Sequence, residues 1–407
     1  MDLHLEKAKD KRQKAKVKIT GSKSETNRLL LLQALYPNLT LENTSNSDDS
    51  EVMQKALNSQ FTIHNSELID VHHAGTAMRF LTAYFSIQEG KEVVLTGSTR
   101  MKERPIKILV EALNQLGAEI SYEENEGFPP IRIKGKKLTQ NKVSLPANVS
   151  SQYISALLLI APKLENGLEL TLEGEITSVP YIKMTLALLN EIGVKTSFKN
   201  NVIKVNPKLN TQHPISLTIE SDWSSASYWY SIVALSEIGI QISLSSYKEN
   251  SLQGDSALVE IYQDFGVETT FNSDNSITIS KERIHNSQLT THNSQLNNSP
   301  DIAQTIAVTC FGLGMGCDLT GLHTLKIKET DRLEALKMEL TKLGAEISVT
   351  NDSLYLKSSS AIKEKISIST YQDHRMAMAF APLALKVPII IENAEVVSKS
   401  YPSFWED

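Results

Sequence analysis

The sequence Leu113-Asn-Gln-Leu-Gly-Ala-Glu-Ile-Ser121 returns almost unchanged as Leu340-Thr-Lys-Leu-Gly-Ala-Glu-Ile-Ser348. Weaker copies occupy residues 188–196 and 261–269. The shared glycine falls at positions 117, 193, 266 and 344, which lie 73 to 78 residues apart. A recurrence at nearly constant spacing predicts an architecture built from internal repeats.

Each copy predicts the same local structure. An amphipathic helix ends at the glycine, and a glycine at this point suits the left-handed conformation that often terminates helices. A short alternating strand follows, as in Ala118-Glu-Ile-Ser-Tyr122. Such repeats imply α+β units stacked into two lobes. The segment around Lys55-Ala-Leu-Asn58 is a candidate for a worn fifth copy.

The composition predicts a soluble protein of two domains. The chain has 407 residues, 41% hydrophobic and 22% charged, about twice the length that one hydrophobic core usually holds. A net charge of −6 argues against a nucleic-acid partner. Two cysteines cannot form a disulfide framework, so we expect a reducing compartment. The first twenty residues carry seven Lys or Arg and no apolar signal segment, which predicts a cytoplasmic protein.

Three further segments bear on the core. The uncharged residues 143–162 predict a buried helix with a polar start rather than a membrane span. Cys310 and Cys317 lie in apolar, glycine-rich sequence, which favours packing over nucleophilic chemistry. In the polar stretch 281–299, His285-Asn-Ser-Gln-Leu289 is followed by His292-Asn-Ser-Gln-Leu296, and we expect an exposed loop there.

Several turns combine small residues with cations. Thr20-Gly-Ser-Lys-Ser-Glu-Thr-Asn-Arg28 enters an apolar run, so its Gly, Ser and Lys can cradle an anion or simply cap a surface helix. Ser150-Ser-Gln152 can likewise bind a phosphate or cap a helix. If these turns meet in a cleft, their basic residues would focus positive potential on small polyanions. The residues concerned are Lys23, Arg28, Arg104, Lys328, Arg332, Arg375 and Lys399.

Asp301 and Glu329 are the carboxylates that we expect among these cations, as acid–base chemistry requires. Alone, an aspartate before an apolar run such as residues 302–308 would usually be a helix cap. The adjacent His72 and His73 suggest a metal site, but no third ligand stands at zinc-like spacing, so we expect no metal.

Together these segments resemble the 5-enolpyruvylshikimate-3-phosphate synthase family over nearly the whole chain. Four motifs stand in the family's order, between Gly21-Ser-Lys23 and the terminal Lys399-Ser-Tyr-Pro402. They are Ala74-Gly-Thr-Ala-Met-Arg79, Met101-Lys-Glu-Arg-Pro105, Lys328-Glu-Thr-Asp-Arg332 and Asp373-His-Arg-Met-Ala-Met378.

This resemblance implies an α/β fold, a two-lobed inside-out α/β barrel of six βαβαββ units, three per lobe, with the active site in the cleft between lobes. Residues 1–20 and 222–407 would form one lobe, and residues 21–221 the other.

The resemblance also implies a reaction. The enolpyruvyl group of phosphoenolpyruvate would move to the 5-hydroxyl of shikimate 3-phosphate through a tetrahedral intermediate, with release of phosphate, in chorismate and aromatic amino-acid biosynthesis. Fixed cations and proton-carrying carboxylates would suffice, with no metal and no organic cofactor. Partners would be these small molecules, without nucleic acid or membrane, and the protein would be a monomer.

The resemblance assigns roles to individual residues. Asp301 would be the base for the 5-hydroxyl, Glu329 the proton carrier at C3, and Lys23 would touch both substrates. The shikimate 3-phosphate site would comprise Lys23, Ser24, Arg28, Ser150, Ser151, Gln152, Ser178, Asp301, Thr324 and Lys328. The phosphoenolpyruvate site would comprise Lys23, Gly75, Arg104, Gln152, Arg332, Arg375 and Lys399.

Three residues depart from the family pattern. His73 replaces the usual Asn and Phe80 the usual Pro, and both flank Gly75, where the family's inhibitor glyphosate packs. Sensitivity to glyphosate is therefore open. Thr324 replaces an Asn of many members but keeps a hydroxyl donor.

Two alternatives stand beside this assignment. A UDP-N-acetylglucosamine enolpyruvyl transferase shares the fold, but it usually has Lys-Asn near its start and a cysteine on a mobile loop. A catalytically inactive relative that binds phosphorylated ligands would be marked by loss of Lys23, Asp301 or Glu329, and all three are present.

Overall fold

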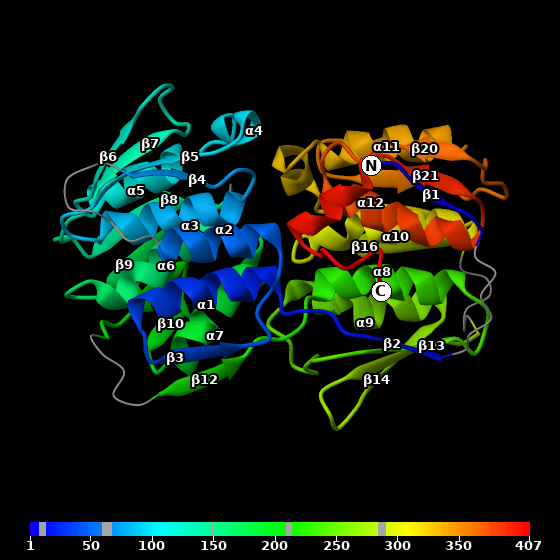
Figure 1. The fold of residues 1–407 in the computed structure, drawn as a ribbon, viewed down its shortest axis with the longest axis horizontal. Coiled ribbons are helices and arrows are strands. Elements are labelled where there is room, and N and C mark those ends of the chain that lie inside the picture. The colour runs from blue at the N-terminus through cyan, green and yellow to red at the C-terminus, as the bar shows by residue number, and fades with distance from the viewer. Residues whose placement is uncertain (8–13, 59–66, 149, 209–213, 284–289) are drawn as a thin grey trace. The chain divides into compact units, whose positions relative to one another are not determined.

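The computed structural model describes residues 1–7, 14–58, 67–148, 150–208, 214–283 and 290–407 (Figure 1). The chain divides into two compact units. Unit 1 comprises Met1–Gly21 and Glu220–Asp407, and unit 2 comprises Ser22–Ile219.

The two chain passages that bound unit 2 are paired with each other within unit 1. Gly21 and Ser221 form an antiparallel bridge. Ser221 Oγ donates a hydrogen bond to the Ile19 carbonyl at 2.6 Å, and the Asp222 N–H donates to the Thr20 carbonyl at 3.2 Å. The chain therefore leaves and re-enters unit 1 at one point.

The four repeat copies correspond to four four-stranded sheets of identical topology. The first and second strands are parallel, the fourth pairs antiparallel with the second, and the third lies at the outer edge. The orders are β4-β5-β7-β6 and β8-β9-β11-β10 in unit 2, and β2-β13-β15-β14 and β16-β17-β19-β18 in unit 1.

The strands of these sheets are short. Those of unit 2 are β4 Glu67–Asp70, β5 Glu92–Thr96, β6 Glu119–Tyr122, β7 Ile131–Lys134, β8 Lys142–Pro146, β9 Leu168–Glu173, β10 Thr196–Lys199 and β11 Val202–Val205. Those of unit 1 are β2 Lys14–Val17, β13 Gln241–Leu244, β14 Val267–Phe271, β15 Ile277–Lys281, β16 Thr291–Gln295, β17 Gly316–Thr320, β18 Ile347–Val349 and β19 Leu354–Leu356.

In each repeat, one helix precedes the second strand and a second helix joins the second and third strands, and in the repeat that starts with β2 the whole of unit 2 lies in the sequence between β2 and the first helix. The first helices are α3 Gly75–Ser86, α6 Ser151–Ile160, α8 Trp223–Leu235 and α10 Ala303–Leu313. The second helices are α5 Lys107–Gln115, preceded by the short α4 Thr99–Lys102, then α7 Val179–Glu191, α9 Leu258–Ile261 and α11 Arg332–Lys342. This is the βαβαββ unit that the family resemblance implied, and it fits the α+β units predicted from the repeats.

Two smaller sheets complete the units. In unit 2, β3 Leu39–Glu42 pairs in parallel with β12 Ile215–Thr218, accompanied by α1 Lys23–Leu35 and α2 Asp48–Leu57. In unit 1, β21 Ile389–Ile391 pairs with β20 Ile366–Ile368 in parallel and with β1 Leu3–Leu5 antiparallel, accompanied by α12 His374–Phe380. The start of the chain thus closes the last sheet of unit 1.

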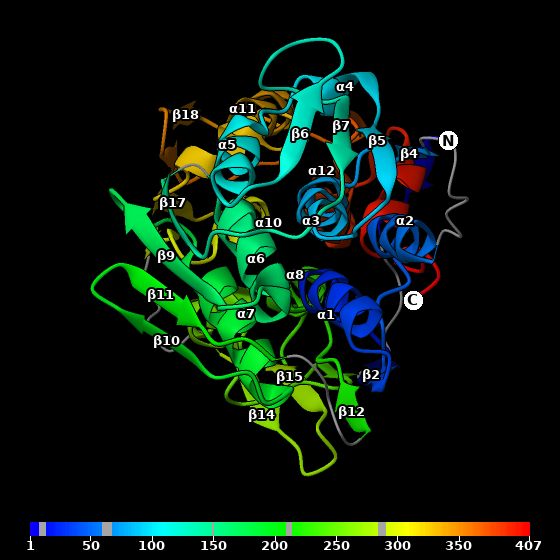
Figure 2. The ribbon, with the colours of Figure 1, turned by 90° about the vertical axis from the view of Figure 1, so that its left-hand side faces the viewer.

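The helices α1, α3 and α6 lie at the centre of unit 2, with sheets around them (Figure 2). Nearly every residue of α3 and α6 is buried, whereas strands such as β9 alternate between buried and exposed positions. A helix that is apolar on all sides must be enclosed, and an alternating strand fits a sheet with one face in water. In unit 1, α8, α10 and α12 are buried in the same way.

The repeat glycines adopt the predicted conformation. Their φ angles are +104° at Gly117, +85° at Gly193, +71° at Gly266 and +102° at Gly344. Side chains with a Cβ avoid this region, so the recurrence of glycine follows from the turn between helix and strand. At the candidate fifth copy, α2 ends at Asn58, whose φ of −90° is not left-handed.

The polar stretch before Asp301 is not a loop throughout, so that prediction is wrong for residues 291–295, which form β16. His292 is 3% exposed, and its ring nitrogens lie 2.8 Å from Asp264 Oδ2 and 2.6 Å from Ser294 Oγ. A buried imidazole with both nitrogens hydrogen-bonded can replace an apolar residue in a strand. Residues 285–289 lie outside the described chain.

Other expectations about the core are confirmed. Cys310 and Cys317 are buried free thiols. The uncharged segment forms the buried helix α6. Across the described ranges, no helix combines the length and the apolar character needed to cross a membrane.

We predict that Gly344→Ala lowers the free energy of unfolding by about 1–2 kcal/mol, the cost of a left-handed conformation for an L residue. An added Cβ would lie 3.7 Å from the nearest atoms, in the Lys363 side chain, so the loss would be conformational rather than steric. Urea unfolding measures it, with Ser348→Ala on the exposed face of β18 as control. Equal stability of Gly344→Ala and the parent protein would show that position 344 does not require glycine.

Candidate functional site

In both units, buried helices carry polar residues in their first turns, where the helix is less enclosed. Thr76 is the only residue of α3 that is not buried, and Gln152 is the only one of α6. Ser224 holds the same position in the first turn of α8, and Arg375 lies in the first turn of α12. Free N–H groups and the positive end of the helix dipole favour anions at such places.

Arg332, the first residue of α11, connects three carboxylates of unit 1. Nε donates to Asp373 Oδ2 at 2.6 Å, Nη1 to Asp301 Oδ1 at 2.7 Å, and Nη2 to Glu329 Oε2 at 2.8 Å. Its side chain is 2% exposed. Burial alone would lower the pKa of Arg332, but the three carboxylates outweigh burial and hold it above its ordinary value. The guanidinium is therefore a permanently charged link between the starts of α10, α11 and α12.

Asp301 lies among cations, as expected for a site carboxylate, and the alternative of a simple helix cap does not describe its contacts. It lies in the 3₁₀ turn Pro300–Ile302 before α10, and its carboxylate meets cations. Lys328 Nζ lies 3.3 Å from Oδ1, and Arg375 Nη2 lies 3.8 Å from Oδ2. Burial alone would raise the pKa of Asp301, but Lys328, Arg375 and Arg332 outweigh it and hold the pKa below its ordinary range. Asp301 is therefore ionised at neutral pH.

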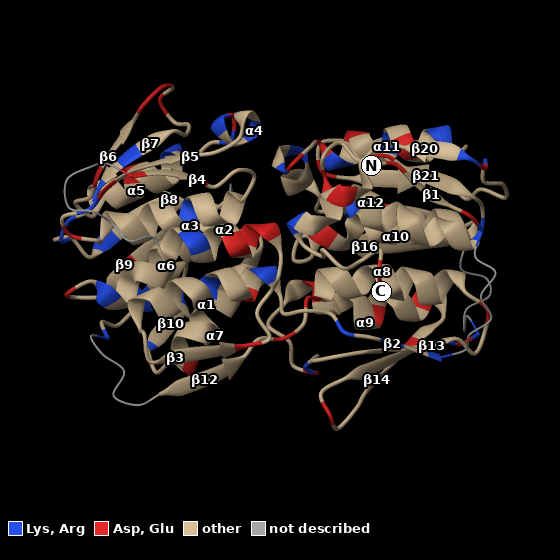
Figure 3. Ribbon diagram, viewed as in Figure 1, with Lys and Arg blue, Asp and Glu red and all other residues tan. Residues whose placement is uncertain are grey.

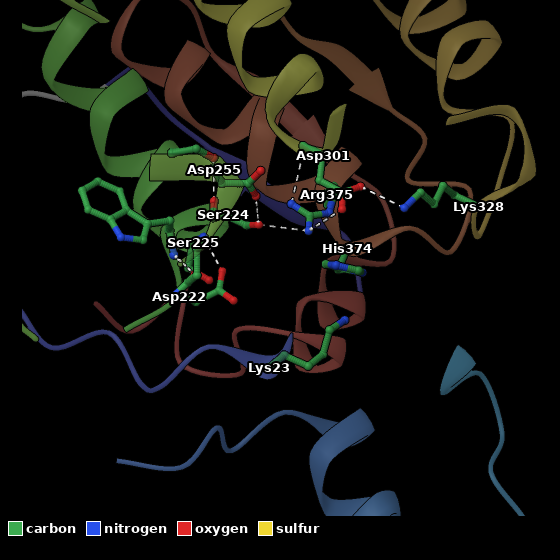
Figure 4. Close-up of polar contacts among 12 residues, drawn as sticks. Lys23, Asp222, Ser224, Ser225, Asp255, Asp301, Lys328, His374 and Arg375 are labelled. Atoms are coloured by element: carbon green, nitrogen blue, oxygen red, sulfur yellow. Dashed lines mark hydrogen bonds and ion pairs between the residues drawn. The ribbon is translucent and has the colours of Figure 1, made fainter. Parts of the chain in front are cut away.

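Three residues of this cluster were not singled out as site residues from the sequence. Asp373 caps α12 by accepting a hydrogen bond from the Arg375 N–H at 2.8 Å. Ser224 Oγ accepts from Arg375 Nη2 at 3.2 Å and donates to Asp255 Oδ2 (Figure 4). Burial and repulsion from Asp301 raise the pKa of Asp255 to about 6. Asp373 stands inside a family motif and could have been chosen, whereas no local pattern marks Asp255.

Lys399 and Thr324 lie in segments that lead into this cluster. Lys399 Nζ donates to the Gln372 carbonyl at 2.7 Å, next to Asp373 in sequence. Thr324 lies in the 3₁₀ helix His323–Ile327, which ends just before Lys328. Its hydroxyl is buried and forms no hydrogen bond with any described residue. An unsatisfied buried hydroxyl fits a place where a ligand or water supplies the partner.

Unit 2 brings together Gly75, Arg104 and Gln152. The Arg104 guanidinium lies so close to Gly75 that an added Cβ would stand 2.5 Å from Nη1. Gln152 Nε2 donates to Thr76 Oγ1 at 3.1 Å. Behind them, Arg79 Nη1 donates to the Gly75 carbonyl at 3.1 Å. Three predicted phosphoenolpyruvate residues thus meet where α3 and α6 begin.

Lys23 is the first residue of α1, and its ammonium lies 3.3 Å from Asp49 Oδ2. Asp49 belongs to the acidic first turn of α2, red in Figure 3. A cation at a helix N-terminus is unfavourable for the helix dipole, and Asp49 offsets that cost. Lys23 therefore occupies a position that helix stability does not explain.

Arg28 is an internal residue of unit 2. Its guanidinium donates to Thr185 Oγ1 at 2.8 Å, Ser155 Oγ at 3.1 Å and the Ser24 carbonyl at 2.7 Å. Burial lowers its pKa to about 10. These bonds join α1 to α6 and α7.

The predicted serines lie at helix starts. Ser150 caps α6 by accepting from the Gln152 N–H at 3.2 Å, and the adjacent Ser151 is the first residue of that helix. Ser178 precedes α7 in a left-handed conformation with φ +54°. Non-glycine residues held in this region often mark functional turns.

The residues that depart from the family pattern have clear contacts. His73 Nδ1 lies 2.9 Å from Ser98 Oγ, and Ser98 caps α4. Phe80 is buried in α3, with the Arg28 guanidinium 5.4 Å from its ring centre. Among the described residues, no three His, Cys, Asp or Glu side chains are grouped as metal ligands.

Comparisons with known proteins identify relatives along the chain. The family model of EPSP synthase (3-phosphoshikimate 1-carboxyvinyltransferase) matches residues 38–407. A 3-phosphoshikimate 1-carboxyvinyltransferase of Bacteroides fragilis is 46% identical over 97% of this chain and 94% of its own length. One from Haemophilus influenzae is 36% identical over 96% of this chain and 95% of its own length.

The solved structures agree on the fold. EPSP synthase of Acinetobacter baumannii aligns with a TM-score of 0.77 at 20% identity, over 100% of this chain and 97% of that chain. The enolpyruvyl transferase NikO from Streptomyces tendae aligns at 0.72 with 13% identity, over 100% and 95%. The predicted α/β fold is confirmed.

We predict that Arg332→Met lowers the free energy of unfolding by about 3–5 kcal/mol, because it leaves carboxylates buried without their partner. The matched control is Arg132→Met. Arg132 also pairs with two carboxylates, Glu92 and Glu123, but its side chain is 30% exposed. That change should cost about 1 kcal/mol or less. Chemical denaturation compares the two, and equal losses would contradict the central place of Arg332.

We predict that Asp255→Asn alters the pH dependence of stability. A carboxyl whose pKa is raised on folding stabilises the protein at low pH, and this contribution is lost as pH rises through the folded pKa, here about 6. From pH 4 to 7, the stability of the variant should therefore improve relative to the parent by on the order of 2 kcal/mol. Urea unfolding at several pH values measures this, and parallel stability curves would overturn the assignment.

Proposed function

This chain belongs to the EPSP synthase family, and we propose that it transfers the enolpyruvyl group of phosphoenolpyruvate to the 5-hydroxyl of shikimate 3-phosphate. The observation that carries this proposal is the Asp301 carboxylate, surrounded by Lys328, Arg332 and Arg375. Such a cluster can bind an anionic substrate and move a proton in one place.

Asp301 would accept the proton of the 5-hydroxyl as that oxygen attacks C2 of the enol. An ionised carboxylate can accept a proton at neutral pH, but a depressed pKa makes it a weak base. The substrate's own anionic groups would remove this obstacle. When they engage Arg332 and Arg375, those cations are partly neutralised, and the pKa of Asp301 rises toward its ordinary value.

Glu329 would deliver the proton to C3. Its carboxylate accepts from Arg332 Nη2, and 22% of its side chain remains exposed, so it can exchange protons with water. Glu329, left ionised by that step, would then take back a proton from the new methyl group of the tetrahedral intermediate, and phosphate would leave as the dianion with the proton that Asp301 took from the hydroxyl. Fixed cations stabilise the leaving dianion without reorganisation. Lys23 would serve as a further cation toward both substrates.

We assign substrate binding by the same reasoning. Phosphoenolpyruvate would be held by Lys23, Gly75, Arg104, Gln152, Arg332, Arg375 and Lys399. Shikimate 3-phosphate would be held by Lys23, Ser24, Arg28, Ser150, Ser151, Gln152, Ser178, Asp301, Thr324 and Lys328. The anion-favouring helix starts of both units support this division. Arg28 uses its N–H groups within unit 2, so its contact with the ligand stays a prediction.

We further propose a cytoplasmic monomer that needs no metal and no organic cofactor, because cations and carboxylates of the chain supply the required charges and proton carriers. The two units described above would be the two lobes of the family. The reducing compartment inferred from the two cysteines supports the location.

Released phosphate is the measurement that tests the function. Purified protein with both substrates should release phosphate, and omission of either substrate should abolish release. Asp301→Ala and Lys23→Ala should each lower the rate at least about a hundredfold, the size expected for a lost acid–base or charge-stabilising group. Asp274→Ala, which removes an exposed carboxylate hydrogen-bonded to Ser276, serves as control.

The same assay separates the alternatives. Release with UDP-N-acetylglucosamine but not with shikimate 3-phosphate would move the assignment to the related transferase. No release with either acceptor, from a folded protein, would indicate an inactive relative.

A further inference from the structure

We propose that Asp255 is a positioning residue that holds the Arg375 guanidinium in place through the hydroxyl of Ser224. This inference rests on the proposed function, because it concerns how Arg375 is presented to phosphoenolpyruvate. Neither Asp255 nor Ser224 belongs to the substrate-binding set named above. Both would act through Arg375 rather than on the reacting atoms.

The three side chains form a directed series of hydrogen bonds. Arg375 Nη2 donates to Ser224 Oγ at 3.2 Å, and Ser224 Oγ donates to Asp255 Oδ2 (Figure 4). A guanidinium can only donate and an ionised carboxylate can only accept, so the single proton of the hydroxyl has one possible direction. The negative charge of Asp255 therefore strengthens the acceptor that faces Arg375.

The hydrogen bond to Ser224 matters for Arg375 because the Asp301 carboxylate pairs mainly with two other cations. Arg332 and Lys328 both approach Asp301 Oδ1, at 2.7 and 3.3 Å. Arg375 reaches Oδ2 only at 3.8 Å, beyond hydrogen-bond distance, although its Nη1 donates to the Asp301 carbonyl at 3.2 Å. Loss of the Ser224 bond would let the Arg375 guanidinium shift toward the Asp301 carboxylate, where it would compete with the substrate hydroxyl.

Asp255 is itself fixed by the segment around it. It lies in the 3₁₀ helix Gly254–Ala257 and is 4% exposed. The neighbouring Gln253 binds the chain before α8 at two points. Its Oε1 accepts from the Trp223 N–H, and its Nε2 donates to the Ser221 carbonyl, each at 2.9 Å. Asp255 and Ser224 are thus held on one rigid framework, which a positioning role requires.

A buried ionised carboxylate lowers the free energy of unfolding unless its charge is compensated. The pKa of Asp255 is raised by burial and by Asp301, so keeping it ionised costs stability at neutral pH. Because an ionised Asp255 destabilises the fold, its presence is better explained by its role in orienting Arg375 than by packing. The same cost agrees with the stability change expected for Asp255→Asn.

Steady-state kinetics test the proposal. Ser224→Ala and Asp255→Ala should raise the KM for phosphoenolpyruvate about tenfold, the effect of about one charge-assisted hydrogen bond. The KM for shikimate 3-phosphate should stay within about twofold. Ser224→Thr keeps a hydroxyl and should recover most of the loss. Ser231→Ala is the matched control, since Ser231 is a buried hydroxyl two turns along α8, bonded to Thr309.

Measuring the effect of Ser224→Ala on the KM in the Arg375→Lys variant shows whether that effect depends on Arg375. Lysine cannot offer the forked guanidinium that reaches Ser224 and Asp301 together. In Arg375→Lys, the further change Ser224→Ala should therefore add less than twofold to the KM. A full tenfold increase in that background would mean that Ser224 acts by another route, and the proposal would fail.

A chemical readout keeps the proposal separate from the transferase assignment. Phenylglyoxal modifies accessible guanidinium groups, and peptide mass spectrometry reports its rate at Arg375. That rate should rise several-fold in Ser224→Ala and Asp255→Ala but not in Ser231→Ala. Unchanged rates in all variants would overturn the positioning role even in an active enzyme. Raised rates in a protein that transfers nothing would uphold it and reject the proposed function alone.

Discussion

The buried guanidinium of Arg332 is the charge on which the site of unit 1 depends. It meets three carboxylates that enter from different segments: Asp301 before α10, Glu329 before α11 and Asp373 at the cap of α12. Asp301 and Asp373 could not be buried there alone, because desolvation of an unpaired charge costs roughly several kcal/mol per ion. The hydrogen bonds that offset this cost also fix the directions in which the helix starts face. The contacts of Arg332 with the three carboxylates therefore both stabilise unit 1 and position the groups proposed to act on the substrates.

The repeat explains why the chemistry gathers at helix ends. In each βαβαββ unit the first helix is enclosed, so its sides can carry only apolar or fully bonded groups. Its N-terminal turn is the part that remains open to polar residues, as Thr76, Gln152 and Ser224 show. The exposed N–H groups there suit phosphate and carboxylate ligands. An enclosed first helix with an accessible N-terminal turn occurs in both units, and it creates anion-favouring positions without any specialised loop.

Much of this could be predicted from the sequence, because the information is local. The left-handed glycines follow from a helix that must turn into a strand with no more than four residues between them, and the burial of Cys310 and Cys317 follows from their apolar neighbours. The loop prediction for residues 291–295 failed because Asn and Ser are typical of loops, while a hydrogen-bond partner of the buried His292 is Asp264, 28 residues away. Asp255 was missed for the same reason, since Arg375 is separated by 151 residues from the Ser224 that joins them. Contacts over such distances are set by topology and not by local pattern.

The proposed reaction is an addition followed by an elimination at the enol, and the origin of the hydrogens in the product reports on it. If C3 gains a proton before a methyl hydrogen is lost, then the reaction in heavy water must place solvent deuterium in the methylene group of the product. Proton NMR of the product formed from phosphoenolpyruvate and shikimate 3-phosphate in D₂O measures this. Addition followed by elimination requires deuterium at that carbon, and a product that keeps all of its methylene hydrogens would rule this reaction out.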